Sequence, residues 1–349
     1  MHRGRNRSGH NGHPTNQLTR GLIALLVFAV LAAGVLIWLD AHEASKYAGD
    51  ETRSTMSEGF ATLKTITVDG VNYRLKPAVT TVLIAGIDQP DDQRKTASTV
   101  TDYRNGGQAD FLLLVAIDHT DRKIHQLQID RDTMAEIDIL GIFGNETGTR
   151  TQQICLAHYF GATPRDNAKY TLRAVNRLLQ VEEISSYFIL DYGDIPAFND
   201  VIGGVSVRIP DDMSSVDPGW TEGKTVLLRG TDAESFVRAR MSVGDGTNAS
   251  RMVRQKEYMQ NAVAQVRSQL RSDPDFASKL MHTVEPLAVT NMNPNRIINE
   301  ISQSTNYEVL PMDYLEGTYA VGEDGFVEFH MQENSAREWV LKHLYTVIK

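Results

Sequence analysis

The longest uninterrupted apolar run of the chain lies at residues 21–39 and carries no charge. A run of this length can cross a bilayer as a helix. The segment before it, residues 1–20, contains four arginines and no acidic residue. The positive-inside rule therefore places this tail in the cytosol and the chain after Asp40 outside the cell. A cleaved signal peptide, with Ala41 and Ala44 at the cleavage site, is the alternative, but the apolar run is longer than a usual signal-peptide core. We expect a single-pass membrane anchor.

The segment after the anchor is polar up to residue 60 and predicts an extracellular stalk. It is followed by two short alternating segments, TITV and VNYRL, separated by an Asp69-Gly70 pair. Asp-Gly between alternating segments is a strong signal for a tight β-hairpin. Residues 40–79 are therefore predicted to form a stalk and a hairpin.

Two apolar runs then predict strands buried on both faces, TVLIAGI at 81–87 and DFLLLVAID at 110–118. The segment KIHQLQID at 123–130 predicts a third strand. Polar residues gather at the strand ends, and a long polar loop joins the first two runs. Long loops in compact domains are commonly functional, and apolar strands with polar ends are typical of an α/β site.

Helical and strand patterns alternate further along the chain, which indicates an α/β domain. We expect helices at 149–163, 166–180 and 195–204, and strands at 186–191 and 205–210. The predicted catalytic domain covers residues 80–270. Residues 271–349 are predicted to form an accessory segment packed on this core, with helices near 275–303 and 335–349 around a glycine-rich extended section.

Composition narrows the range of functions. The formal net charge of −9 argues against general nucleic-acid binding. Cys155 is the only cysteine, which excludes an intrachain disulfide and a cysteine-based metal site. The chain has no GxGxxG, P-loop, HExxH or GxSxG motif. His158 is interpreted as a packed helix residue rather than a catalyst.

Four arginines surround one glycine-rich turn within residues 236–255: Arg238, Arg240, Arg251 and Arg254. Guanidinium groups held close together repel one another, and their planar forks fit phosphate oxygens, so phosphate or diphosphate is the expected counter-ion. The alternative is that these cations complement helix ends or are solvated surface residues.

The local pattern explains how these arginines could converge. Thr231 and Glu234 form a capping box, so a helix should start near Asp232 and end close to the first two arginines. Asn248 is the expected cap of a second helix. On that second helix, one face should carry Arg251, Arg254, Gln255 and Tyr258.

In this order, IAGID, QADFLLLVAID, IDRDT, LAHYFG, VIGGVSVRIP and FVRAR…DGTNASRMVRQ resemble the LytR–CpsA–Psr (LCP) family over residues 81–270. The resemblance implies an α/β fold with a central mixed β-sheet flanked by helices, an apolar channel for a lipid tail and an arginine-lined mouth. It implies a phosphotransferase that moves a glycopolymer, such as a teichoic acid or capsular polysaccharide, from a polyprenyl diphosphate to a peptidoglycan hydroxyl. The partners would be the lipid-linked glycopolymer, peptidoglycan and the cell membrane, with no nucleic acid.

The resemblance also implies site residues. Mg²⁺, with Mn²⁺ as an alternative, would be held by Asp88 and Asp110. The diphosphate would be bound by Arg131, Arg238, Arg240, Arg251 and Gln255, to which the arginine pattern adds Arg254. Candidate catalytic residues are Arg131, Asp132, Asp245 and Asn248. Phosphoryl transfer depends on positioning and charge neutralisation, which these residue types supply.

The chain departs from the family pattern at three positions. Gln108 stands where many members have arginine, Asp130 where they have proline, and Asn248 where they have an aspartate whose implied role is to help deprotonate the acceptor. Asp245 or Asp132 could replace that aspartate. Two other functions stay open, a polyprenyl-diphosphate hydrolase and a non-catalytic regulator that binds polyprenyl phosphates.

Overall fold

The computed structural model describes residues 65–88, 106–141, 144–181, 184–273, 276–293, 296–297, 300, 303–304 and 307–348. The predicted anchor at 21–39 and the stalk up to residue 60 lie outside these ranges. Among the described residues, no helix is both long enough and apolar enough to cross a membrane.

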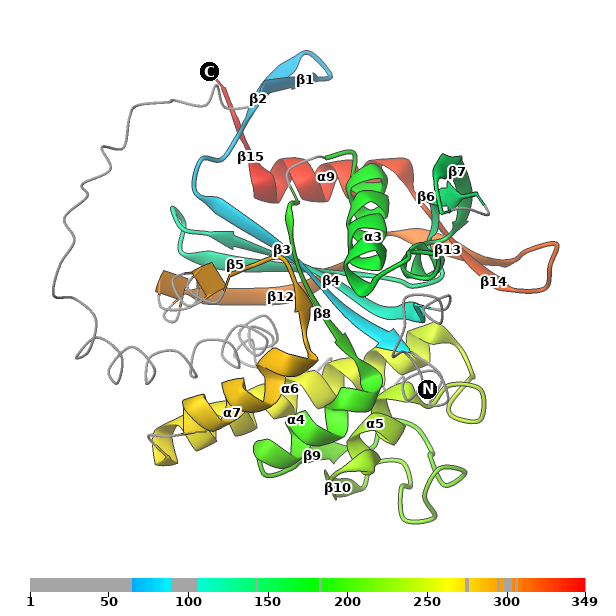
Figure 1. Ribbon diagram of the computed structural model, residues 1–349, viewed down its shortest axis with the longest axis vertical. Helices are drawn as coiled ribbons and strands as arrows, with labels where there is room; N and C mark the ends of the chain where they lie inside the picture. Colours follow the sequence, from blue (N-terminus) through cyan, green and yellow to red (C-terminus); the bar gives the residue numbers. More distant parts are fainter. Residues whose placement is uncertain are drawn as a thin grey trace, which may run out of the picture.

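The centre of the fold is a six-stranded mixed sheet (Figure 1). Its strands, in spatial order, are β11 (Val289–Thr290), β8 (Ser186–Asp191), β3 (Val79–Asp88), β4 (Gln108–Asp118), β5 (Lys123–Ile129) and β12 (Glu308–Tyr314). The β8–β3 and β5–β12 pairs are parallel, and the other neighbours are antiparallel. This arrangement confirms the predicted α/β class and mixed sheet.

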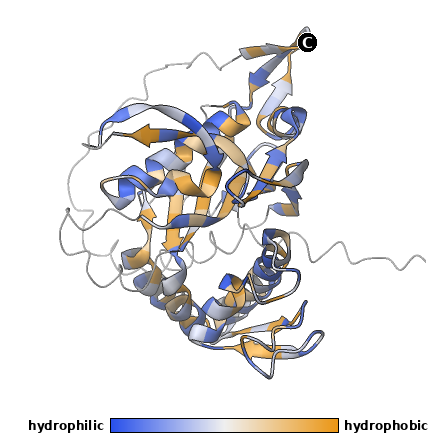
Figure 2. Ribbon diagram, turned by 90° about the vertical axis from the view of Figure 1, so that its right-hand side faces the viewer, coloured by the Kyte–Doolittle hydropathy of each residue, from blue (hydrophilic) through white to orange (hydrophobic). Residues whose placement is uncertain are grey.

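Both faces of the sheet are covered, which explains why β3 and β4 are almost entirely apolar (Figure 2). One face packs against η2 (Ile154–His158), α3 (Pro164–Leu179) and α9 (Glu333–Leu344). The other packs against α4 (Ile195–Val201), α5 (Thr231–Arg238), α6 (Asn248–Ser272) and α7 (Phe276–Val284), with η3 (Tyr192–Asp194), η4 (Glu285–Leu287) and the ribbon of β9 (Val205–Arg208) and β10 (Thr225–Leu228). Along β4, Leu112 and Leu113 point into opposite cores.

Three small β-ribbons surround this body. The predicted hairpin is confirmed as β1 (Thr65–Val68) and β2 (Val71–Leu75), and both turn residues have positive φ, 52° at Asp69 and 78° at Gly70. The C-terminal β15 (Tyr345–Val347) pairs with β2. The other two ribbons are β6 (Met134–Leu140) with β7 (Glu146–Gln153), and β13 (Gly317–Val321) with β14 (Val327–Met331).

Two predictions from the sequence are corrected. The helix expected at 149–163 is instead the end of β7 followed by the 3₁₀ turn η2, because residues 149–153 pair with β6. The C-terminal segment is also more than an accessory layer. It supplies β11 and β12 to the central sheet and α9 to one of its faces, so the domain does not end at residue 270.

Candidate functional site

The ends of β3 and β4 bring two carboxylates to one edge of the sheet. Asp88 pairs in register with Gln108. Gly86 pairs with Phe111 and Ile87 with Ala109, so Asp110 is the extra residue of a β-bulge. Bulges redirect side chains and are frequent beside active sites.

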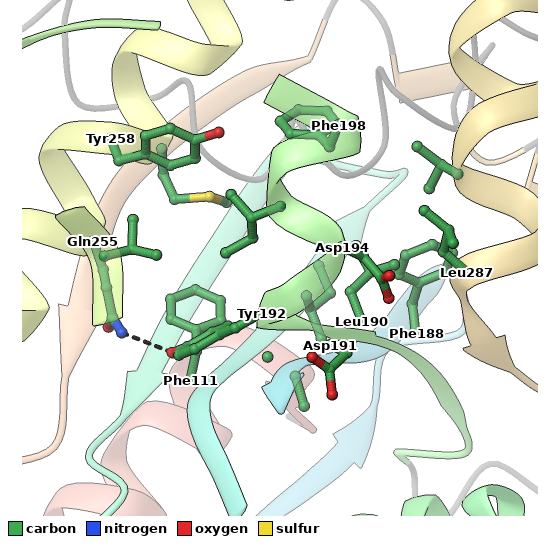
Figure 3. Close-up of a pocket in the computed structure, with 17 residues that line it drawn as sticks. Phe111, Phe188, Leu190, Asp191, Tyr192, Asp194, Phe198, Gln255, Tyr258 and Leu287 are labelled. Atoms are coloured by element: carbon green, nitrogen blue, oxygen red, sulfur yellow. Dashed lines mark hydrogen bonds between the residues drawn. The ribbon is translucent and has the colours of Figure 1, made fainter. Parts of the chain in front are cut away.

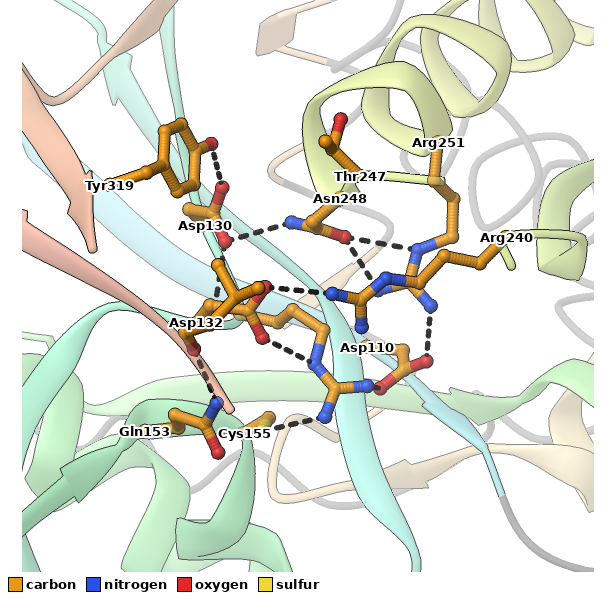
Figure 4. A network of polar contacts seen from close by, with 12 residues as sticks. Asp110, Asp130, Asp132, Gln153, Cys155, Arg240, Thr247, Asn248, Arg251 and Tyr319 are labelled. Carbon is orange, nitrogen blue, oxygen red and sulfur yellow. Dashed lines mark hydrogen bonds and ion pairs between the residues drawn. The ribbon is translucent and has the colours of Figure 1, made fainter. Parts of the chain in front are cut away.

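Asp110 is the centre of a buried ion-pair network (Figure 4). One of its carboxylate oxygens accepts a hydrogen bond from Arg131, and the other accepts one from Arg251 at 2.5 Å. The side chains of Asp110 and Arg251 are each 3% exposed, and that of Arg131 is 11% exposed. Residues from β4, from the segment after β5 and from α6 are thereby held together.

Arg131 has further partners that no sequence pattern indicates. It donates to the side-chain oxygen of Gln108 and, at 3.1 Å, to the sulfur of Cys155. Its Nε lies 3.2 Å from Asp132. Burial raises the pKa of the Cys155 thiol to about 12, so this sulfur is a neutral neighbour. Gln108 stands where many family members have an arginine, and here its side-chain oxygen accepts a hydrogen bond from Arg131.

Asp132 lies between Arg131 and Arg240, and its Oδ2 is 3.2 Å from the Arg240 guanidinium. Burial raises the pKa of this carboxyl, and the neighbouring Asp130 acts in the same direction, while the arginines oppose the shift. Asp132, one of the predicted catalytic residues, therefore contacts both Arg131 and Arg240.

Arg238 and Arg240 converge because α5 ends between them. Arg238 is the last residue of α5, and Ala239 is already extended, with ψ of 134°. Arg238 binds Asp88 at 2.5 Å and Glu234 at 3.0 Å. The predicted capping box is wrong, since Gly230 is the N-cap and makes no side-chain cap bond, and the Glu234 side chain binds Arg238.

The start of α6 differs from the prediction by one residue. Thr247 is the N-cap and accepts from the Ser250 amide, whereas Asn248 is the first helical residue. Asn248 is buried, and its side-chain oxygen accepts two hydrogen bonds from Arg251, at 3.0 and 2.6 Å. Its amide nitrogen donates to Asp130 at 2.8 Å.

Tyr319, on β13, also contacts this group of polar residues, and sequence reasoning did not predict it. Its hydroxyl donates to the second oxygen of Asp130 at 2.5 Å (Figure 4). No local signal indicates this contact, because 189 residues separate the partners. We refer to Arg131, Arg238, Arg240 and Arg251 as the arginine cluster.

Two predicted site residues lie elsewhere. Arg254 has a side-chain exposure of 0% and binds Asp211 at 3.0 Å and the Ala239 carbonyl at 2.5 Å, so it braces the loop behind the cluster instead of facing a ligand. Asp245 is exposed and accepts hydrogen bonds from Thr247, which lower its pKa. A carboxylate occupied in this way is a poor general base.

An apolar cavity of about 130 Å³ is lined by Gln255, one helical turn after Arg251 on α6 (Figure 3). Its wall is formed by residues of β3, β4, β8, η3, α4, α5, α6, α7 and η4, including Phe111, Phe188, Phe198 and Tyr258. Gly86 also lines it, where an added Cβ would lie 2.6 Å from the Tyr192 ring. Gln255 reaches this wall and donates to the Tyr192 hydroxyl at 2.8 Å.

His158 is confirmed as a packed residue. It is 3% exposed, and its Nδ1 lies 3.0 Å from the Thr171 hydroxyl. Burial lowers its pKa to about 3, so the ring is neutral at physiological pH.

The fold and the site together define an α/β protein with a cluster of four arginines near an apolar cavity. The LytR_cpsA_psr family model matches residues 42–339, and the chain belongs to this family.

Two sequence relatives are teichoic acid transferases by name, each 26% identical. They are the polyisoprenyl-teichoic acid–peptidoglycan teichoic acid transferases TagU of Halalkalibacterium halodurans and TagV of Bacillus subtilis. The matches cover 53% and 67% of this chain and 52% and 55% of the relatives. The chain thus spans about half the length of the relatives that it matches.

Solved structures share the fold at low sequence identity. A protein of Streptococcus agalactiae, gbs0355, superposes with a TM-score of 0.60 at 17% identity, over 78% of this chain and 91% of that one. B. subtilis TagV gives 0.56 at 19% identity, over 77% and 98%. TagT bound to LI-WTA gives 0.55 at 17% identity, over 77% and 91%.

Proposed function

We propose that this protein is a phosphotransferase that moves a glycopolymer from a polyprenyl-diphosphate carrier onto a hydroxyl of peptidoglycan. The observation that carries the proposal is the continuity of the arginine cluster with the apolar cavity. Arg251 belongs to the cluster, and Gln255, one helical turn later, lines the cavity. A polyprenyl diphosphate has the same division into an anionic head and a hydrocarbon tail. The names of TagU and TagV support a teichoic acid or a similar polymer as the donor.

The four arginines divide into two roles. Arg238 and Arg240 are 33% and 21% exposed, so they can turn their planar forks to the phosphate oxygens. Arg131 and Arg251 are almost fully buried and paired with Asp110. They hold the strand ends in place and add positive charge behind the phosphates.

The residues also fit a divalent cation. Four aspartates, Asp88, Asp110, Asp130 and Asp132, lie beside the four arginines of the cluster, so a diphosphate would meet little net positive charge without a metal ion. Asp88, on the strand beside Asp110, is 27% exposed and offers a carboxylate oxygen. Both oxygens of Asp110 accept hydrogen bonds from Arg131 and Arg251, so Asp110 would have to share an oxygen with the metal. Mg²⁺ commonly needs only one or two carboxylates besides phosphate oxygens and water. No group of three or more acidic, histidine or cysteine side chains suited to a metal occurs among the described residues, so the ligand phosphates would complete the shell. When bound, Mg²⁺ would neutralise charge that develops on the phosphates.

The location that suits this reaction is the outer face of the cell membrane, with residues 21–39 as the anchor. Protease added to intact spheroplasts should then release the domain that follows. Protection of that domain would contradict this location.

Product analysis tests the function. The full chain is incubated in detergent with Mg²⁺, a farnesyl-diphosphate-linked N-acetylglucosamine donor and purified glycan strands of peptidoglycan. The proposal predicts a phosphodiester-linked product on the strands together with farnesyl monophosphate. Release of sugar phosphate into water alone would indicate a hydrolase, and binding without turnover would indicate a regulator.

A further inference from the structure

Asp130 differs from the other aspartates of the site in its partners. Each of the other three pairs with an arginine. The described hydrogen bonds of Asp130 come from neutral groups only: the Asn248 amide at 2.8 Å, the Tyr319 hydroxyl at 2.5 Å and the backbone N–H of Asp132 at 2.8 Å. Among the described residues, the carboxylate oxygens of Asp130 are therefore engaged by no guanidinium group.

Tyr319 connects this carboxylate to the solvent. Asp130 is 6% exposed, whereas Tyr319 is 48% exposed, so its phenol is the outward side of the pair. The Tyr319 ring is fixed by Phe329 of the neighbouring strand, with ring centroids 5.0 Å apart. A phenol that donates to Asp130 still has lone pairs that can accept a hydrogen bond from an incoming hydroxyl.

The position of Asp130 also accounts for a departure from the family pattern. The family resemblance places an aspartate where this chain has Asn248. Here the Asn248 amide reaches Asp130 across 2.8 Å. The carboxylate is therefore still present, one hydrogen bond away and on a different element.

We propose that Asp130 is the terminal proton acceptor of the transfer reaction and that Tyr319 relays the proton to it. This inference rests on the proposed function. As the acceptor oxygen forms its bond to phosphorus, its proton passes to the Tyr319 oxygen, and the phenol proton passes to Asp130. The bond between that phosphorus and the bridging oxygen breaks, and polyprenyl monophosphate leaves with the electron pair. Tyr319 is neutral before and after the step.

The surroundings are consistent with a relay through a neutral phenol. Burial raises the pKa of Tyr319, and its hydrogen bond to Asp130 adds to the shift, so the phenol stays protonated. The charged groups around the pair are Asp132 and Arg131 after β5, Arg240 after α5, and Arg251 on α6.

Transfer by the full chain to peptidoglycan strands tests the relay, with the farnesyl-diphosphate donor described above. Asp130→Asn keeps the hydrogen-bonded shape and should lower the transfer rate by about 100-fold or more. The decline of the rate at acidic pH, which a carboxylate acceptor imposes, should disappear in this variant. Tyr319→Phe should lower the rate by at least about 10-fold. Affinity for geranylgeranyl diphosphate should be unchanged in both. Asp212→Asn, in an exposed loop, is the matched control.

The outcomes separate the relay from the proposed function. Asp130→Asn with the wild-type rate and the wild-type acid limb would overturn the relay while leaving the transferase in place, and so would Tyr319→Phe with the wild-type rate. A slower Asp130→Asn enzyme that keeps the acid limb would show a structural role only. Absence of transfer by the wild type, with diphosphate binding intact, would overturn the proposed function and the relay with it.

Discussion

Replacement of Asp110 by asparagine should destabilise the protein far more than the same change at Asp88. Asp110 is 3% exposed and neutralises two guanidinium groups that are 3% and 11% exposed. Breaking a buried ion pair costs about 3–5 kcal/mol, because an uncompensated charge stays behind. Asparagine keeps one acceptor oxygen, so we expect a loss near the lower end, about 3 kcal/mol.

The matched variant is Asp88→Asn. Its carboxylate is 27% exposed and its partner Arg238 is 33% exposed, so solvent screens the pair, and its loss should cost less than about 1 kcal/mol. For a domain of this size, 1 kcal/mol shifts the melting temperature by roughly 2 °C, which predicts a gap of at least about 4 °C between the two variants.

Thermal unfolding of the full chain, followed by circular dichroism at constant detergent and salt, measures that gap. An excess of geranylgeranyl diphosphate should narrow it, because the ligand replaces the lost negative charge beside the arginines. Equal melting temperatures of the two variants without ligand would refute the central place of Asp110 in the buried network.

Three further predictions follow from the described contacts. Arg238→Lys and Arg240→Lys should weaken binding of geranylgeranyl diphosphate by about 1–3 kcal/mol in calorimetry, and binding of the monophosphate by less, with the melting temperature nearly constant. Equal affinities of the wild type and both variants for the diphosphate would show that these arginines are ordinary surface cations. Arg254→Met should behave in the opposite way, with a stability loss of about 2–3 kcal/mol in urea unfolding and unchanged diphosphate affinity of the folded protein; weakened binding without destabilisation would restore Arg254 as a ligand. Folding lowers the pKa of His158 from 6.5 to about 3, so the free energy of unfolding should be unaffected by His158 above pH 6.5 and should fall towards pH 3 by up to about 1.4 kcal/mol per pH unit. Urea unfolding of His158→Gln should therefore show a shallower dependence of stability on acid pH. An unchanged slope would contradict the neutral buried ring.

The central strands could be predicted from sequence because burial on both faces leaves a continuous apolar run, as in residues 110–118. The hairpin at Asp69 and Gly70 could be predicted for a local reason, since positive φ at both turn residues favours this pair. The roles of β11 and β12 could not be predicted, because strand pairing across more than 100 residues leaves no local pattern.

The site was predictable where chain geometry is local. The convergence of Arg238 and Arg240 follows from the helix end between them. Arg254 was assigned to the ligand because helical spacing places it beside Arg251, but spacing does not reveal that Asp211 and the Ala239 carbonyl enclose it. Tyr319 and Cys155 reach the cluster from distant parts of the chain, so only the fold identifies them as neighbours.

The central claim is that one ligand occupies both the arginine cluster and the apolar cavity. A crystal structure of the protein with geranylgeranyl diphosphate and Mg²⁺ tests it most directly. We expect the diphosphate on Arg238 and Arg240 and the isoprenoid chain between Phe111, Phe198 and Tyr258. A diphosphate bound away from these arginines, or a tail that lies outside the cavity, would contradict the account.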